Sequence, residues 1–367
     1  MRICYLGNVN SVHFRKMASS LARMGHDIHI VSFQVPKNAI EGAKTHIIDQ
    51  RIHTILSVFP FFGEKLWFSM LKVFINIIRP DLVHAHYLTD YGDVGEKVGV
   101  GPFVVSVYGS DILLDARNDG NAIERRVLEK ADLVICDGQN AMKKIAEMNV
   151  DMKKVRLIFI GVDVDRFKSK DVSHRLGNSS GRRFTVVSTR KLFRIYDVDM
   201  LISSIPMIVN EWNRIRFIII GDGPERERLV NLVKENEIEE YVEFWGSIDN
   251  DDMPEVLAKA DIYVSTSRSD SGLAVSTAEA MSCEMPVIVT DNSDNRLWIK
   301  DFRNGFVIQS GSPIQLAEKV LFLVKNPSLI LEYGKNNREL IVAGFSMMSE
   351  MEKIEAEYRN CLLRLGI

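Results

Sequence analysis

The chain has 367 residues, of which 46% are hydrophobic and 26% are charged, and its formal net charge is -3. This length favours two domains over a single core, and the composition is that of a globular protein. The weak negative charge argues against a nucleic-acid-binding protein, which relies on a strong positive field.

The charges are unevenly divided along the chain. Residues 1–168 hold 22 Lys and Arg against 19 Asp and Glu, whereas the remainder holds 24 against 30. An anionic substrate or lipid surface is one interpretation of the basic first half, and a chance imbalance is the other.

Two features bear on the cellular compartment. The opening MRICYLGNVNS has one arginine and a short apolar run, which do not make a signal peptide, and no apolar run reaches the roughly 20 residues of a membrane span. The four cysteines lie far apart without any C-x-x-C pair, so zinc and redox motifs have no support. We therefore expect a cytoplasmic protein in a reducing compartment.

Short runs rich in Val and Ile alternate with helical patterns throughout. The predicted strands are 3–6, 28–33, 82–85, 103–107, 133–137, 155–160, 184–188, 216–220, 242–245, 262–265 and 287–290. Continuous apolar strands indicate parallel sheets covered by helices on both faces. A polar Ser/Gly/Lys/Arg-rich stretch at 166–183 predicts a linker between two doubly wound α/β domains. Ligands of such sheets bind beyond the carboxyl ends of the strands, and a cleft between the domains is the default site.

The most apolar segment, 55–78, is interrupted at 63–65 by Gly-Glu-Lys. After the interruption, four apolar residues recur at helical spacing beside Lys65 and Lys72: Leu66, Met70, Phe74 and Ile77. The pattern predicts an amphipathic helix, which either packs on the core or lies on a membrane surface.

Polar residues follow two predicted strands of the first domain. His84 and His86 alternate onto one face of a strand end, but no nearby third metal ligand stands out. In VYGSDI, Ser110 and Asp111 follow the next strand, and Asp111 either caps a turn or receives a sugar hydroxyl. No G-x-S-x-G nucleophile elbow is found.

Basic residues and glycines follow two strands of the second domain. Arg190, Lys191 and Arg194 come after the strand at 184–188, where arginine can bind a diphosphate bidentately, although solvated surface charge is an equal interpretation. Gly223 belongs to the G-x-G of IIIGDGPERERL, which is either a tight turn or a nucleotide contact.

The segment SRSDSGLAVSTAEAMSCEMPVI, residues 267–288, is rich in small side chains. It joins a strand to a helix that we expect to start at Ser276 or Thr277, and a helix N-terminus attracts phosphate. Glu279 then falls in the first helical turn, and its spacing from Ser276 fits a capping box. Helix capping and ligand binding are both open for Glu279.

In their order, these segments resemble the retaining GT-B glycosyltransferases of family 4 over nearly the whole chain. The likeness rests on SVHFRKMASSLARMGHDIHIVSF, RPDLVHAHY, PFVVSVYGSDI, IGVDVDRF, GDGPERERL, VEFWGSI, ADIYVSTS, AEAMSCEMPVIVTD and NGFVI. It implies an acceptor domain at 1–165, a nucleotide-sugar domain at 166–347, and a C-terminal helix at 348–367 that returns to the first domain. It also implies sugar transfer from a UDP- or GDP-sugar to a glycan, glycolipid or small-molecule hydroxyl, without bound metal or cofactor.

The resemblance also assigns roles to individual residues. Glu279 matches the glutamate that binds the ribose hydroxyls, and Arg190 matches the arginine that meets the diphosphate. The loop whose amides meet the phosphates corresponds to Gly272, Leu273, Ala274 and Val275, which follow Ser271.

Several positions depart from the family pattern. A glycine pair of the family is Gly7-Asn8 here, and a histidine is Tyr108. A lysine-glycine pair is Tyr196-Asp197, and two glutamates are Ser271 and Leu297. Arg194 or Lys191 would supply the missing cation, and Asp270 the missing carboxylate next to Ser271.

We interpret the chain as a divergent subgroup in which His86, Asp111 and Asp270 serve the sugar or acceptor. The competing hypotheses are a non-catalytic sugar-nucleotide-binding partner of another transferase, and a nucleotide-sugar epimerase.

Overall fold

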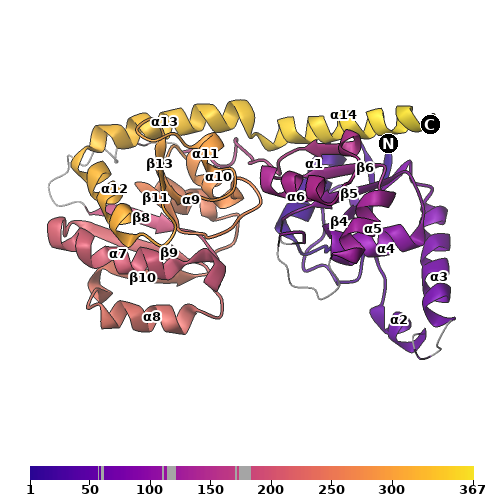
Figure 1. Cartoon of the computed structure of the whole chain (residues 1–367), viewed down its shortest axis with the longest axis horizontal. Helices are drawn as coiled ribbons and strands as arrows, with labels where there is room; N and C mark the ends of the chain where they lie inside the picture. Colours follow the sequence, from indigo (N-terminus) through magenta and orange to yellow (C-terminus); the bar gives the residue numbers. More distant parts are fainter. Residues whose placement is uncertain (57, 59–61, 110, 114–120, 170–171, 173–182) are drawn as a thin grey trace. The chain divides into compact units, whose positions relative to one another are not determined.

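The computed structural model of the chain describes residues 1–56, 58, 62–109, 111–113, 121–169, 172 and 183–367 (Figure 1). The chain divides into two compact units. Unit 1 contains Met1–Ile160 and Met348–Ile367, and unit 2 is Gly161–Met347. Each unit is a parallel sheet with helices, so the predicted fold class of two doubly wound α/β domains is confirmed.

Unit 1 is built on a seven-stranded sheet in the order β3-β2-β1-β4-β5-β6-β7. The strands are β1 Arg2–Leu6, β2 Asp27–Ser32, β3 Ala43–Ile47, β4 Leu82–His86, β5 Phe103–Val107, β6 Leu133–Cys136 and β7 Val155–Leu157. Ile3 of β1 pairs with Ile28 of β2 on one side and with Leu82 of β4 on the other. The strand order reverses between β1 and β4, so a ligand is expected at the carboxyl ends of these two strands.

The helices of unit 1 cover this sheet and are joined by the end of the chain. They are α1 Val12–Arg23, α2 Gln50–Leu56, α3 Gly63–Ile78, α4 Asp93–Val98, α5 Ala122–Lys130, α6 Gln139–Glu147 and α14 Met347–Leu365, with a π-helical turn η1 at Tyr87–Gly92 and a 3-10 turn η2 at Met152–Lys154. Met351, Ile354, Tyr358 and Cys361 of α14 are buried at helical spacing.

Unit 2 repeats the same strand order with six strands, β10-β9-β8-β11-β12-β13. The strands are β8 Phe184–Ser188, β9 Ile215–Ile220, β10 Val242–Gly246, β11 Ile262–Ser265, β12 Val287–Thr290 and β13 Gly305–Ile308. The helices are α7 Val198–Glu211, α8 Arg226–Glu235, α9 Met253–Ala258, α10 Val275–Ser282, α11 Asn295–Trp298, α12 Pro313–Lys325 and α13 Pro327–Gly344, with 3-10 turns η4 Arg194–Tyr196 and η5 Glu239–Tyr241. The reversal of strand order lies between β8 and β11.

The start of the predicted linker is not a free connection. Phe167 is fully buried, and its carbonyl oxygen accepts hydrogen bonds from Ser282 Oγ at 2.6 Å and from Arg338 Nη1 at 2.9 Å. Ser169 Oγ donates to the carbonyl oxygen of Cys283. Residues 166–169 therefore pack into unit 2, and most of the remaining linker, 170–171 and 173–182, lies outside the described residues.

The face of helix α3 that packs on the core is not the row Leu66, Met70, Phe74 and Ile77. Its buried residues are instead Gly63, Trp67, Leu71, Ile75 and Ile78. Both rows have helical spacing, and Phe74 is the only member of the first that is half-buried. Within the part of the chain that the structure describes, no helix has the length and apolar character that crossing a bilayer requires.

Candidate active site

The candidate residues of unit 2 gather at the carboxyl edge of its sheet, where β8 and β11 lie side by side. Val186 of β8 pairs with Ile262 of β11, so the loops that follow the two strands leave the sheet together. Arg190 follows β8, Asp270 lies in the loop after β11, and Ser276 lies at the start of α10. The sheet topology thus brings together residues that are about 80 positions apart in the chain.

Arg190 is the centre of this group. Its Nη2 donates to Asp270 Oδ1 at 2.5 Å, and its Nη1 donates to Ser276 Oγ at 3.1 Å. The guanidinium carbon lies 4.3 Å from the centre of the Tyr196 ring. Its Nε is buried and has no hydrogen-bond partner, and such a buried donor is costly unless a ligand satisfies it.

The charge of Arg190 is maintained despite its surroundings. Burial disfavours the charged form, but the carboxylate of Asp270, together with Tyr263 and Tyr196, holds the pKa of Arg190 above its ordinary value. The site therefore presents a fixed cation, which suits an anionic group such as a diphosphate.

Hydroxyl groups extend the network behind Arg190. Tyr263 OH donates to Ser276 Oγ at 3.0 Å, and Thr189 Oγ1 donates to Tyr263 OH at 3.4 Å. The Ser276 hydroxyl is thus committed to Arg190 and Tyr263. It does not cap the helix: α10 begins at Val275, its N-cap is Ala274, and that cap makes no side-chain hydrogen bond.

The capping-box interpretation of Glu279 is therefore wrong. The helix starts at Val275, one residue before Ser276 and two before Thr277, which puts Glu279 beyond its first turn. Glu279 is 6% exposed, and its Oε1 accepts a hydrogen bond from Asn250 Nδ2 at 3.3 Å. Contact with the ribose hydroxyls stays a prediction. Sequence reasoning missed Asn250, which lies in a loop with no distinctive pattern.

The loop that precedes α10 has the position expected of a phosphate-binding loop. Gly272 and Leu273 are buried, whereas Ser271, Ala274 and Val275 are half-buried. They lead directly into the N-terminus of α10, where unpaired backbone N–H groups favour an anion. Their contact with phosphate stays a prediction.

The G-x-G turn packs closely against the backbone of the segment that carries Arg190. A Cβ on Gly221, whose φ is +137°, would lie 2.3 Å from the carbonyl oxygen of Arg190, and one on Gly223 would lie 2.4 Å from that of Leu192. Leu192 N also donates to the carbonyl oxygen of Asp222 at 3.0 Å. Close backbone packing therefore accounts for both glycines, and a nucleotide contact at Gly223 stays a prediction.

The Asp197 of the Tyr196-Asp197 departure is neutralised by a residue that sequence reasoning missed. Asp197 has φ +49°, in the left-handed region that favours glycine. Its buried carboxylate accepts hydrogen bonds from Arg268 Nε and Nη2 at 2.8 and 2.9 Å. Arg268 stands two residues before Asp270 in the polar loop, and this position was the only indication in the sequence that it belongs to the site. Lys191 and Arg194 are exposed nearby, and their contact with a diphosphate stays a prediction.

In unit 1, His86 lies at the carboxyl end of β4 within a cluster of aromatic rings. Its Nδ1 is 2.5 Å from Tyr108 OH, and its ring stacks on that of Tyr108 and meets the edge of Phe14. Burial lowers the pKa of His86 to about 3, so the ring is neutral. Its Nε2 is buried without a hydrogen-bond partner and is the atom left for a ligand.

His84 does not complete a metal pair with His86. Its Nδ1 lies 2.5 Å from Tyr358 OH and its Nε2 lies 2.8 Å from Ser106 Oγ, so both nitrogens are occupied by the protein. Among the residues that the structure describes, no three His, Cys, Asp or Glu side chains gather as a metal site.

Asp111 joins the loops that follow β4 and β5. Its Oδ1 accepts a hydrogen bond from Tyr108 N and its Oδ2 accepts one from Leu88 N, each at 3.0 Å. Burial raises the pKa of Asp111 to about 6, although these backbone N–H groups favour the carboxylate. A loop-holding role is thus established by geometry, while a sugar hydroxyl contact stays a prediction. The neighbouring Ser110 lies outside the described residues.

Gly7 and Asn8 form the turn after β1. A Cβ on Gly7 would lie 2.2 Å from the Phe14 ring, so the glycine admits Phe14 beside His86. Asn8 Oδ1 accepts a hydrogen bond from Asn10 N at 2.9 Å and shapes the turn. The glycine of this pair is therefore needed for packing, and a ligand contact of either residue stays a prediction.

Solved structures with the same architecture identify the fold. Sucrose-phosphate synthase from Thermosynechococcus elongatus has a TM-score of 0.82 at 17% identity, covering 99% of this chain and 100% of the other. Anabaena HepE in complex with UDP also has a TM-score of 0.82 at 17% identity, covering 98% and 100%. The chain thus has the GT-B fold, as the sequence predicted.

Family models and curated relatives then give the family. Residues 169–340 match the model of the glycosyl transferases group 1, and residues 2–138 match that of the glycosyl transferase 4-like proteins. The chain is 24% identical to N-acetyl-alpha-D-glucosaminyl L-malate synthase from Bacillus anthracis over 363 residues, covering 94% of this chain and 91% of that protein. It is 28% identical to the putative glycosyltransferase EpsD from Bacillus subtilis over 360 residues, covering 92% and 91%. The chain belongs to the group 1 glycosyltransferases.

Proposed function

We propose that this glycosyltransferase moves a hexose from a UDP- or GDP-sugar to an acceptor hydroxyl with retention of anomeric configuration. The observation that carries the proposal is the buried cation Arg190, held by Asp270 and Ser276 with an unsatisfied Nε–H at the carboxyl edge of the unit 2 sheet. HepE, which shares the fold, was solved with UDP and with UDP-glucose, and this supports a nucleotide-sugar donor.

The donor is assigned to unit 2. The Glu279 carboxylate accepts hydrogen bonds from the ribose hydroxyls, and the backbone of 272–275 meets the phosphates with Ser271 beside it. Arg190, aided by Lys191 and Arg194, stabilises the negative charge that develops on the leaving diphosphate. Because protein cations and amides supply this stabilisation, no bound metal or cofactor is required.

In the transfer step, the acceptor hydroxyl oxygen bonds to the anomeric carbon on the face from which the diphosphate departs. The bond between that carbon and the diphosphate oxygen breaks, and its electron pair goes to the diphosphate. The acceptor proton passes to the same phosphate oxygen, so atoms and charge balance within the two substrates.

The acceptor is assigned to unit 1. His86 is neutral, so it serves as a hydrogen-bond partner of a sugar or acceptor hydroxyl and not as a general acid. Asp111 and the Gly7-Asn8 turn hold the loops around it, and Asp270 of unit 2 is the candidate carboxylate for the donor sugar. The acceptor is a glycan, a glycolipid or a small molecule, which makes the reaction a step in glycan biosynthesis.

We also propose that the enzyme acts in the cytoplasm, peripherally at the inner face of the membrane. Each of the four cysteines is a buried thiol outside any disulfide, which agrees with a reducing compartment.

A donor screen followed by turnover tests the function. We expect one UDP- or GDP-sugar to raise the unfolding temperature, because a ligand that binds only the folded state stabilises it. Release of nucleoside diphosphate in the presence of acceptor, and an unchanged anomeric configuration by NMR, then establish the reaction. Glu279→Ala should lose about tenfold in donor affinity, since it removes charged hydrogen bonds. The matched control is Glu227→Ala, at an exposed glutamate of α8.

The departures at Tyr108, Tyr196 and Ser271 motivate the second candidate, a non-catalytic sugar-nucleotide-binding partner of another transferase. Tight donor binding without turnover over a broad acceptor panel would favour it. Conversion of the donor sugar without any acceptor would instead identify an epimerase. Absence of binding by every nucleotide sugar at millimolar concentration would remove the proposal.

A further inference from the structure

Helix α3 of unit 1 has a second apolar face that is turned to solvent. Leu66, Met70, Val73 and Ile77 are 50%, 48%, 60% and 72% exposed. Their spacing of four, three and four residues places them in one row along the helix. The exposed face of a surface helix is normally polar, so this row needs an explanation other than packing on the core.

The row continues into the preceding segment. Ile52 and Ile55 of α2, and Val58 and Phe62 after it, are also exposed. We call these four residues, together with the row on α3, the α2–α3 apolar patch. Ile52 lines the same pocket as the row on α3. Exposed apolar side chains that gather in this way are uncommon on monomeric proteins and mark interaction sites.

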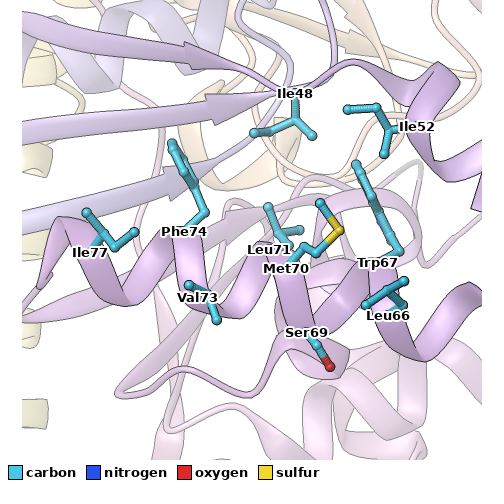
Figure 2. Close-up of a pocket in the computed structure, with 10 residues that line it drawn as sticks. All are labelled: Ile48, Ile52, Leu66, Trp67, Ser69, Met70, Leu71, Val73, Phe74 and Ile77. Carbon is cyan, nitrogen blue, oxygen red and sulfur yellow. The ribbon is translucent and has the colours of Figure 1, made fainter.

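A groove runs along the patch. The space between α3, α2 and the end of β3 forms a pocket with a volume of about 540 Å³. Figure 2 shows Trp67 and Phe74 rising from α3 toward Ile48 and Ile52, and Ser69 is the single polar residue among the ten that line the pocket. Because the exposed row on α3 also lines it, the groove and the row form one apolar surface.

The charges beside the patch indicate which kind of partner it binds. Acidic residues near it are already paired, Asp49 with Arg51 at 2.5 Å and Glu64 with Lys97 at 3.1 Å. Among the described residues, Lys65, Lys72 and Arg79 of this segment form no ion pair, and all three are exposed. A chain with a net charge of -3 thus carries unpaired positive charge next to its exposed apolar helix.

We propose that the α2–α3 apolar patch docks on an anionic lipid bilayer, with the row on α3 inserted among the acyl chains and Lys65 and Lys72 at the headgroups. An apolar face flanked by lysines is the pattern of a helix that lies in a membrane interface. A second copy of the chain fits less well, because a two-fold interface presents the same patch on both sides, so the lysines would face a surface that is also positively charged. The inference deepens the peripheral location proposed above and does not depend on which sugar is transferred.

Vesicle flotation tests the docking. Wild type should bind vesicles of phosphatidylcholine with about one third phosphatidylglycerol more tightly than pure phosphatidylcholine vesicles, and salt should weaken this binding. Val73→Ser with Ile77→Ser should lower binding at least about tenfold, since two apolar side chains no longer leave water. Lys65→Gln with Lys72→Gln should cost about fivefold per charge on anionic vesicles only.

The matched control is Ile314→Ser with Val342→Ser, at exposed apolar positions on α12 and α13 of unit 2, which should leave vesicle binding unchanged. Donor-induced thermal shifts of each variant, measured without lipid, report folding and the donor site separately. A patch variant that loses vesicle binding and keeps its donor response supports docking whichever reaction is found.

Three results would overturn the inference. They are no binding of wild type to the anionic vesicles, equal binding by the Val73/Ile77 variant, or a concentration-dependent dimer that this variant abolishes.

Discussion

Replacing Arg190 with glutamine, alone and together with Asp270→Asn, probes the central contact of the candidate donor site. The two side chains are only 10% and 17% exposed, and Nη2 lies 2.5 Å from Oδ1. Solvent therefore screens the pair weakly, and removal of one partner leaves the other charge buried without a counter-charge. Such losses cost about 3–5 kcal/mol, and because Asp270 keeps some exposure we expect the low end of that range for Arg190→Gln.

The double variant replaces the ion pair with two neutral amides that can bond to each other. We expect its loss of stability to be smaller than the sum of the single losses by about 1–3 kcal/mol, which is the coupling typical of residues in direct contact. Urea denaturation of the three variants, followed by circular dichroism, measures this difference. Additive losses within about 0.5 kcal/mol would refute the buried-pair reasoning.

Turnover separates the structural role of the pair from its proposed role in transfer. Arg190→Gln and the double variant should both lose about 10²–10³ in kcat, because neither restores a cation at the leaving diphosphate. Asp270→Asn should lose less if its task is to hold Arg190. Full activity of Arg190→Gln, or recovery of activity in the double variant, would show that the diphosphate does not meet this residue.

Three further perturbations probe packing and protonation. Gly223→Ala should lower stability by about 1–3 kcal/mol, because the added methyl would lie 2.4 Å from the Leu192 carbonyl oxygen, and an unchanged urea midpoint would contradict this. Burial lowers the pKa of His86 from 6.5 to about 3. The stabilising contribution of His86 is therefore present above about pH 6.5 and is lost as the pH falls toward 3. The urea midpoint of His86→Phe should fall less steeply than that of wild type over this pH range. Burial raises the pKa of Asp111 from 3.8 to about 6. The contribution of Asp111 to stability is therefore present below about pH 3.8 and is lost as the pH rises through 6. Asp111→Asn should lack that loss, and identical pH profiles of stability for wild type and variant would refute the raised pKa.

The sheets were predictable because their central strands are buried on both faces and read as unbroken Val and Ile runs. Two strands were missed. β3 has the sequence AKTHI, which is only partly buried and has no such run, and β13 is buried but has an apolar run of only three residues after Gly305. The face of α3 could not be chosen from periodicity, since the exposed and buried rows have the same spacing and only the tertiary contacts of Trp67 and Leu71 distinguish them.

For the candidate site, residue types were predictable and partnerships were not. Arg190 and Glu279 stand in segments whose order resembles the family, so both were identified from sequence. The bonds of Arg190 to Asp270 and of Asp197 to Arg268 link residues more than 70 positions apart, and they depend on the adjacency of β8 and β11. That adjacency is a property of strand order, which a single sequence does not display.

The return of the chain to unit 1 has a consequence for how the protein is made. Tyr358 on α14 is fully buried, and its hydroxyl meets both Tyr5 OH and His84 Nδ1. Its segment is synthesised only after the 187 residues of unit 2, a delay of roughly 10–40 s at ordinary translation rates. Throughout that interval Tyr5 and His84 lack their contact with Tyr358. Unit 1 is therefore translated first but acquires its last helix only when the chain is nearly complete.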